Sequence, residues 1–207
     1  MSSDKKPYDL RDPTQNPNTL RSDYDVTTLQ NGLVYFLTAV IKNKFEKIVR
    51  IQPQRGGWEK WFQVELCLLI NHFHDRDDVH PVRYHATREK RVYDEDGKSV
   101  DVVISEGETL EKSKRTHVLE IKCGKHNQST NDIAKDIWED WGKLGAITGN
   151  GNGTLQPGLA ATSRVAVCVT VNSLPTLTGD WHRYTFKRDV DGKNYLVHLQ
   201  FRYLTRY

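Results

Sequence analysis

The sequence predicts an α/β (α+β) protein with a central mixed β-sheet, flanking helices and an extra C-terminal β-hairpin. Two observations carry this prediction. The spacing of apolar residues changes from a helical to an alternating period near residue 82, and a helical segment at 131–144 then separates the strand segments. Residues 164–171 (RVAVCVTV) are apolar on both faces, which is typical of a strand in the middle of a sheet.

The first 24 residues precede the predicted domain. Pro7, Pro13 and Pro17 lie there among polar and charged residues, and this composition predicts a flexible arm over residues 1–24. We expect residues 25–207 to form a single domain, because a chain of 207 residues is close to the size of one ordinary domain.

Two helices are predicted after the arm. Asp25 is a candidate N-cap, and apolar residues from Val26 to Ile48 recur at the helical period. Pro53 ends this pattern, and residues 58–74 resume it as a second helix.

Strand segments follow the helices. They are predicted over residues 82–93, 100–105 and 117–123. Asp96-Gly97 joins the first two and is a strong signal for a hairpin. Asp191-Gly192 has the same chemistry and predicts that the last two strands of the chain also form a hairpin.

Composition and charge leave the class of partner open. The chain has 30 Lys and Arg against 27 Asp and Glu, a net charge of +3. This balance is milder than in most dedicated nucleic-acid-binding domains. No apolar run reaches the roughly 20 residues of a membrane helix, and no secretory signal pattern is visible. The three cysteines lack CxxC spacing, so we expect a reducing, cytoplasmic location without disulfides or structural zinc.

Charged residues interrupt two of the apolar strands. Asp101 lies near the start of VDVVIS, and Glu120 and Lys122 lie two residues apart in VLEIKC. Residues i and i+2 of a strand project to the same face, so Glu120 and Lys122 point together. If the two strands are neighbours, Asp101 joins them. Burying such charges is costly unless they are paired or bind a metal, so this cluster is the candidate site.

Two carboxylates and a lysine suit the hydrolysis of a phosphodiester. Carboxylate oxygens are ligands for Mg²⁺, which also binds phosphate oxygens. A metal ion in such a site polarises the phosphoryl group and acidifies the attacking water. The lysine can orient that water or neutralise the charge that develops on the phosphoryl oxygens.

This arrangement resembles the PD-(D/E)xK nuclease superfamily, which includes many type II restriction enzymes, repair nucleases and nuclease toxins. The resemblance rests on Asp101, on Glu120-Ile121-Lys122 and on Glu65 in the preceding helix, and it covers residues 56–171. The chain departs from the motif at residue 100, where valine replaces the proline of the motif's name.

The resemblance implies a restriction-endonuclease-like core and specific roles for these residues. Asp101, Glu120 and the Ile121 carbonyl would bind Mg²⁺, for which Mn²⁺ can substitute, and Lys122 would be the catalytic lysine. Glu65 would match the first-helix acid that helps to hold the metal or its waters. The implied activity is that of a metal-dependent DNA endonuclease, with RNA as an alternative substrate.

Two acids on the second helix compete for that last role. Glu59 and Glu65 are six residues apart, about 120° around a helix, so both are not expected to face the site. The apolar neighbours of Glu65 favour Glu65 as the site residue. The alternative is a partly exposed Glu65 without a role in the site.

Each part of the motif also has a purely structural interpretation. The Glu120–Lys122 pair could be a solvated strand edge, and Asp101 could cap the hairpin turn. The corresponding alternative function is a non-catalytic module that binds nucleic acid or protein with the same fold.

Basic residues near the motif are candidates for contacts to nucleic acid. They are Arg83, Arg88, Lys90, Arg91, Lys125 and Lys135. Lys135 also fits an ordinary solvated helix stripe, and the cations and aromatics of the C-terminal strands fit either a nucleic-acid interface or a solvated basic face. A restriction-type enzyme would form a homodimer, whereas a toxin would require an inhibitory or immunity protein.

Overall fold

The computed structural model describes residues 29–54, 58–74, 84–91, 99–106, 115–145 and 161–204. The helices are α1 (Leu29–Ile51), α2 (Glu59–His74) and α3 (Thr130–Gly145). The strands are β1 (Tyr84–Arg91), β2 (Ser99–Glu106), β3 (Arg115–Cys123), β4 (Ala161–Val171), β5 (His182–Val190) and β6 (Lys193–Leu204). This element order confirms the order predicted from the sequence. The predicted arm, residues 1–24, lies outside the described residues.

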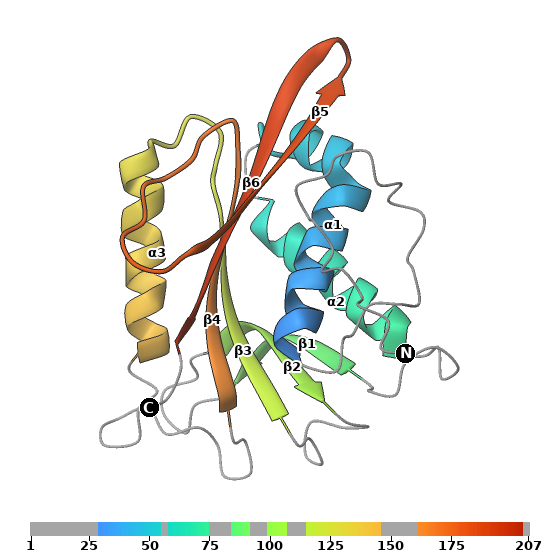
Figure 1. Ribbon diagram of the computed structural model, residues 1–207, viewed down its shortest axis with the longest axis vertical. Helices are drawn as coiled ribbons and strands as arrows, with labels where there is room; N and C mark the ends of the chain where they lie inside the picture. Colours follow the sequence, from blue (N-terminus) through green and yellow to red (C-terminus); the bar gives the residue numbers. More distant parts are fainter. Residues whose placement is uncertain are drawn as a thin grey trace, which may run out of the picture.

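The strands form one mixed sheet in the order β1-β2-β3-β4-β6-β5. β3 and β4 are parallel, and the other neighbouring strands are antiparallel. A parallel pair needs a crossover connection, and α3 lies in the segment that connects β3 to β4. Figure 1 shows α1 and α2 on one face of the sheet and α3 on the other. The predicted mixed sheet with flanking helices is therefore confirmed.

The central strand β4 contributes to both hydrophobic layers. Val165, Val167 and Val169 face the core beneath α1 and α2. Ala166 and Cys168 face the smaller core beneath α3. All five are buried, which explains why this segment is apolar at consecutive positions rather than at alternate ones.

The ladder between β2 and β3 ends before β3 does. These strands pair antiparallel from Glu106 back to Val102, which lies opposite Leu119. Continuing this register would place Asp101 opposite Glu120, but β2 pairs with β3 no further. The last residues of β3 therefore present a strand edge that backbone pairing with β2 does not cover, and this edge positions the candidate site.

Two further observations concern the chemical setting of the fold. Within the described ranges, no helix combines the length and the apolarity needed to cross a membrane. Cys67, Cys123 and Cys168 are buried and unpaired with one another. Burial raises the pKa of the Cys123 thiol well above its ordinary value, so this neighbour of Lys122 stays protonated and is no nucleophile.

Candidate functional site

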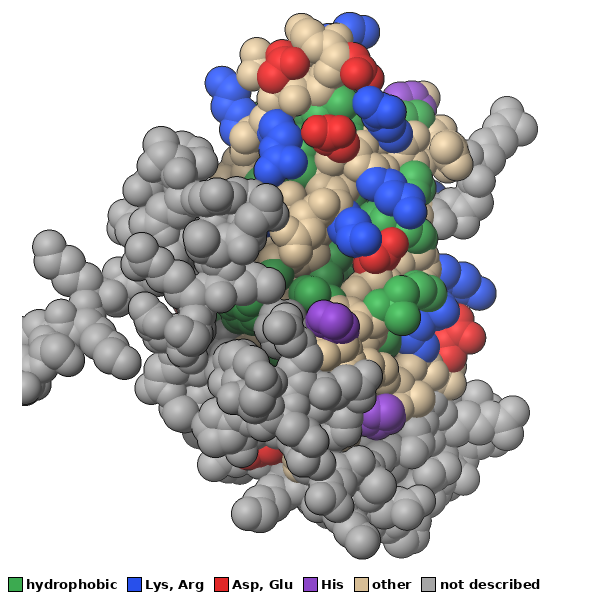
Figure 2. All heavy atoms as spheres, turned by 90° about the vertical axis from the view of Figure 1, so that its right-hand side faces the viewer, with side chains coloured by type: hydrophobic (Ala, Val, Ile, Leu, Met, Phe, Trp, Pro, Cys, Tyr) green, Lys and Arg blue, Asp and Glu red, His purple; other side chains and the backbone are tan. Residues whose placement is uncertain are grey.

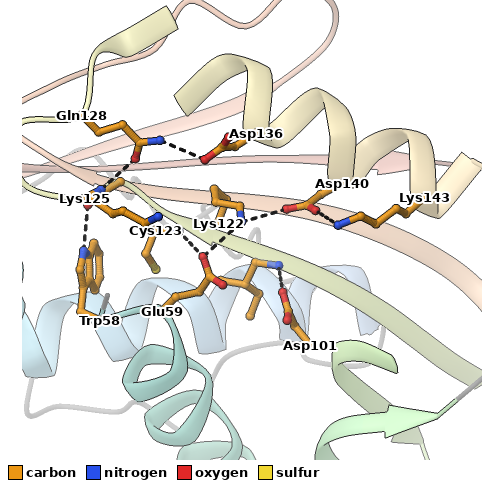
Figure 3. Close-up of polar contacts among 12 residues, drawn as sticks. Trp58, Glu59, Asp101, Lys122, Cys123, Lys125, Gln128, Asp136, Asp140 and Lys143 are labelled. Carbon is orange, nitrogen blue, oxygen red and sulfur yellow. Dashed lines mark hydrogen bonds and ion pairs between the residues drawn. The ribbon is translucent and has the colours of Figure 1, made fainter. Parts of the chain in front are cut away.

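Two carboxylates take the place of the missing β2 ladder along the edge of β3. Asp101 Oδ2 accepts a hydrogen bond of 2.7 Å from the Ile121 amide. Glu59 Oε2, from the first turn of α2, accepts one of 3.2 Å from the Cys123 amide (Figure 3). Both acids are therefore fixed against the backbone of β3 at the point where Lys122 lies.

Trp58 holds the end of the same edge. Its indole Nε1 donates a 2.9 Å hydrogen bond to the Gly124 carbonyl, and both residues are buried. This contact ties the start of α2 to the end of β3, so it sets the position from which Glu59 reaches the edge.

Replacing Trp58 with phenylalanine is expected to destabilise the fold. The variant leaves the buried Gly124 carbonyl without its donor, which costs about 1–3 kcal/mol, in addition to the lost packing of the larger ring. Urea denaturation followed by far-UV circular dichroism measures the change. Trp61→Phe is the control, because Trp61 is only half-buried and lies beneath Lys47. An equal loss in both variants would contradict the role of the Trp58 hydrogen bond.

The side chains of Asp101 and Glu120 meet at this edge, as expected if the strands that carry them are neighbours. Continuing the register of β2 and β3 places Asp101 opposite Glu120, and each carboxyl group affects the pKa of the other. Burial, and then the neighbouring Asp101, raise the pKa of Glu120 to about 9. Burial also raises the pKa of Asp101, although the Ile121 amide opposes this effect. The buried Glu120 and the half-buried Asp101 therefore converge where a positive charge would relieve their repulsion.

Lys122 lies between two carboxylates from different helices. Its Nζ is 3.6 Å from Glu59 Oε2 and 3.3 Å from Asp140 Oδ2, on α3 (Figure 3). Burial alone would lower the pKa of Lys122, but these two carboxylates outweigh burial and raise it. Asp140 also accepts a hydrogen bond from Lys143, on the next turn of α3. The Lys122 side chain is therefore charged, and its two ion pairs fix where its ammonium group points.

The structure corrects the choice between the two acids of α2. Glu65 lies 3.0 Å from Lys44 Nζ and 3.8 Å from Lys47 Nζ, both on α1. Its apolar neighbours pack α2 against the rest of the core, so they direct Glu65 toward α1 rather than toward β3. Glu59 occupies the place beside Lys122 that was expected for Glu65.

Asp140 was not identified as a site residue from the sequence, although its position in the helix could have indicated this role. The buried residues of α3 are Ile133, Ile137, Asp140 and Leu144, which follow one helical stripe. An acid in an otherwise apolar stripe is costly to bury unless it is paired, so its position alone marks it as a candidate site residue.

The basic residues predicted to contact nucleic acid differ in where the structure places them. Lys125 is exposed just beyond the end of β3, close to the site, and Lys135 is exposed on α3. Arg88 instead bonds to Gln63 at 3.2 Å and Glu89 at 3.3 Å, so it holds β1 against α2 rather than facing the cluster. Arg83 and the side chains of Lys90 and Arg91 lie outside the described residues.

The surface that carries α1 and the β5–β6 hairpin is charged but mixed in sign. Figure 2 shows Lys and Arg side chains interspersed with acids there. Arg50, for example, lies 3.3 Å from Asp191 at the tip of the hairpin, and Lys44 and Lys47 pair with Glu65. These cations are therefore partly neutralised by the chain itself.

Cations of the C-terminal strands also make contacts within the fold. Arg202 stacks 4.8 Å over the ring of Trp141. Arg183 donates a 2.8 Å hydrogen bond to the Leu177 carbonyl. These contacts favour the structural interpretation of this set over a nucleic-acid interface.

The donor set around Asp101 fits a hard divalent cation. Asp101 and Glu120 provide carboxylate oxygens. The carbonyl of Ile121 points to the same edge as its amide, because both groups of one residue face the same neighbouring strand. Among the described residues, no three His, Cys, Asp or Glu side chains form a metal-binding group by themselves. The fit therefore depends on two carboxylates and a backbone oxygen, which leaves positions for water or phosphate, as Mg²⁺ prefers.

The acid pair also predicts how the stability of the metal-free protein depends on pH. The pKa of Glu120 rises from its ordinary 4.5 to about 9 on folding. Between these values the folded state holds a proton that the unfolded state has released, so the free energy of unfolding falls as the pH rises. Asp101 and Glu59 are shifted in the same direction.

Glu120→Gln is expected to remove much of this dependence and to be more stable than wild type at pH 9 by roughly 1–3 kcal/mol. Urea denaturation in EDTA at pH 5, 7 and 9 tests this expectation. A wild-type stability that rises toward pH 9, or parallel curves for the two proteins, would contradict it.

The cluster combines acids and lysines from four elements of the fold. They are Glu59 on α2, Asp101 on β2, Glu120 and Lys122 on β3, and Asp140 and Lys143 on α3. Comparisons with family models, with curated proteins and with solved structures find no significant match to this chain. The chemistry available to the cluster is therefore inferred from its own residues.

Proposed function

We propose that this chain is a divalent-metal-dependent nuclease of the PD-(D/E)xK type that cleaves DNA internally. One observation carries the proposal: the buried Glu120 and the half-buried Asp101 lie beside a lysine that two further acids fix in place. A non-catalytic module would gain nothing from burying several charged groups at a broken sheet edge, because their burial is costly.

The arrangement of elements supports the same proposal. A helix, a hairpin, a third strand, a helix and a parallel strand follow one another from α2 to β4. β2 leaves β3 next to Asp101, so the strands separate at the site itself. These features are those expected of a restriction-endonuclease-like core, with β5 and β6 as the additional hairpin.

Asp101, Glu120 and the Ile121 carbonyl would hold the metal, with Glu59 taking the supporting position expected of the helix acid. When bound, Mg²⁺ or Mn²⁺ would polarise the phosphodiester and lower the pKa of the attacking water. A bound cation would stabilise both carboxylates in the charged form, which burial otherwise opposes.

Lys122 would act as a charged donor rather than as a base. Its neighbours Glu59 and Asp140 raise its pKa, so the ammonium keeps its proton at neutral pH. A fixed ammonium can donate to a phosphate oxygen and orient the attacking water, and it stabilises the negative charge that develops during the reaction. Its half-buried position makes it accessible to a phosphate without leaving it fully solvated.

A cleavage assay tests the proposal. Supercoiled DNA, linear DNA and a structured RNA are incubated with the full chain and Mg²⁺, Mn²⁺ or EDTA, beside Asp101→Ala. The proposal requires cleavage that depends on the metal and is lost in a variant shown to be folded by circular dichroism. Nicked and linear products would identify endonuclease action, and a discrete fragment pattern would identify sequence specificity. Binding without cleavage by folded wild-type protein would favour the non-catalytic module.

A further inference from the structure

Lys122 does not pair with the acid nearest to it in the sequence. Glu120 and Lys122 project from the same face of β3, so an ion pair between them would be the simplest arrangement. The structure instead pairs Lys122 with Glu59 on α2 and Asp140 on α3. Glu120 lies opposite Asp101 when the register of β2 and β3 is continued, and the two carboxyl groups affect each other's pKa.

Asp140 is placed to hold the lysine in this direction. It is only 7 % exposed and lies in the core-facing stripe of α3, so packing fixes its position. One carboxylate oxygen faces Lys122 at 3.3 Å, and the other accepts from Lys143, which is 64 % exposed at the rim. Asp140 thus forms ion pairs with both the half-buried Lys122 and the exposed Lys143.

We propose that Asp140 is a positioning residue which, together with Glu59, holds the Lys122 ammonium away from the Asp101–Glu120 pair and leaves that pair free for one divalent cation. This inference rests on the proposed function, because the cation is the metal that the nuclease needs. Without Asp140, Lys122 would turn to Glu120 and occupy the cation's place with its own charge.

The balance of charges supports a single cation. Glu59 and Asp140 are the acids neutralised by Lys122 and Lys143. The remaining acids, Asp101 and Glu120, carry two negative charges when both are ionised. One divalent ion compensates these two charges.

Binding of Mn²⁺ to the full chain, measured by electron paramagnetic resonance of the free ion, tests the inference without any nucleic acid. Wild type is expected to bind one ion per chain. Asp140→Asn is expected to weaken binding by about 10–100-fold, the usual effect of removing a group that orients a metal site. Asp132→Asn is the matched control, because Asp132 lies at the start of the same helix, where it bonds to Ser129.

Two double variants separate positioning from a simple loss of charge. Asp140→Asn with Lys122→Met removes the lysine that would intrude and is expected to restore wild-type Mn²⁺ affinity. Asp140→Asn with Lys143→Met has the same net charge but leaves Lys122 in place, so its affinity is expected to stay low. Equal restoration by both would overturn the inference, since charge alone would then explain it.

A second variant keeps the inference testable if Asp140→Asn does not fold. Glu59→Gln removes the other acid that holds Lys122, and it is expected to weaken Mn²⁺ binding in the same direction and to be rescued by Lys122→Met. Unchanged affinity in both single variants, or two ions per wild-type chain, would overturn the inference while leaving the nuclease proposal intact. A wild-type chain that binds no Mn²⁺ would overturn both.

Discussion

Replacing Lys122 with methionine is expected to lower the rate of metal-dependent cleavage by about 10²–10³-fold, the usual effect of removing one donor that stabilises charge in a transition state. Methionine keeps the length of the side chain but has no charge to place beside the phosphate. Mn²⁺ binding is expected to persist, because Asp101 and Glu120 remain. Cleavage rates under single-turnover conditions, with the protein in excess over a labelled duplex, measure the effect.

Lys193→Met provides the control for this loss, because Lys193 is an exposed lysine at the β5–β6 turn, away from the cluster. Lys122→Arg tests whether a positive charge at residue 122 is enough for cleavage at the wild-type rate. Arginine retains the charge but presents a planar fork that does not fit between Glu59 and Asp140 as an ammonium does. Cleavage by Lys122→Met at the wild-type rate would contradict the catalytic role.

The second large expected effect concerns the two acids of α2, each replaced by glutamine in a separate variant. Glu59→Gln is expected to reduce cleavage by about 10–100-fold, since it loosens both Lys122 and the metal site. Glu65→Gln is expected to leave the cleavage rate unchanged and to lower the free energy of unfolding by less than about 1 kcal/mol, because its partners Lys44 and Lys47 are about half exposed to solvent, which screens the ion pairs.

The two glutamine variants form a matched pair, since both change the same residue type on one helix. Their cleavage rates and their urea denaturation curves are compared side by side. If Glu65→Gln proved the slower enzyme and Glu59→Gln behaved as wild type, the assignment of Glu59 to the site would be wrong.

The broken ladder between β2 and β3 explains why these acids tolerate burial. The amides of Ile121 and Cys123 would be unsatisfied without a neighbouring strand, and Asp101 and Glu59 satisfy them. The same carboxylates therefore complete the fold and line the site. This dual role predicts that removing either acid disturbs stability as well as activity, so every activity comparison requires a check of folding.

Much of the fold follows from local patterns in the sequence. The change in apolar period predicts the element order, and the hairpin signals predict that β1 pairs with β2 and β5 with β6; the structure confirms both. The convergence of Asp101 with Glu120 was expected only if β2 and β3 are neighbours. The structure shows that they are, and residues opposite each other on paired strands lie close together.

Local patterns in the sequence could not decide which helix residues contribute to the site. The period of α2 places Glu59 and Glu65 on different faces, but it does not show which face meets β3 and which meets α1. That choice depends on how the whole apolar surface of α2 packs against α1 and the sheet. Apolar neighbours favoured Glu65 in the sequence, whereas in the folded protein they direct it to Lys44 and Lys47.

The sequence by itself therefore determined the strands and the shared face of Glu120 and Lys122, because strand periodicity and hairpin turns are local properties of the chain. Only the tertiary structure decided that Glu59 and Asp140 hold Lys122. These two residues lie on helices far apart in the sequence, and their approach to one lysine depends on the depth and rotation with which α2 and α3 pack on the sheet. Those quantities are set by the complete core, which no local pattern encodes.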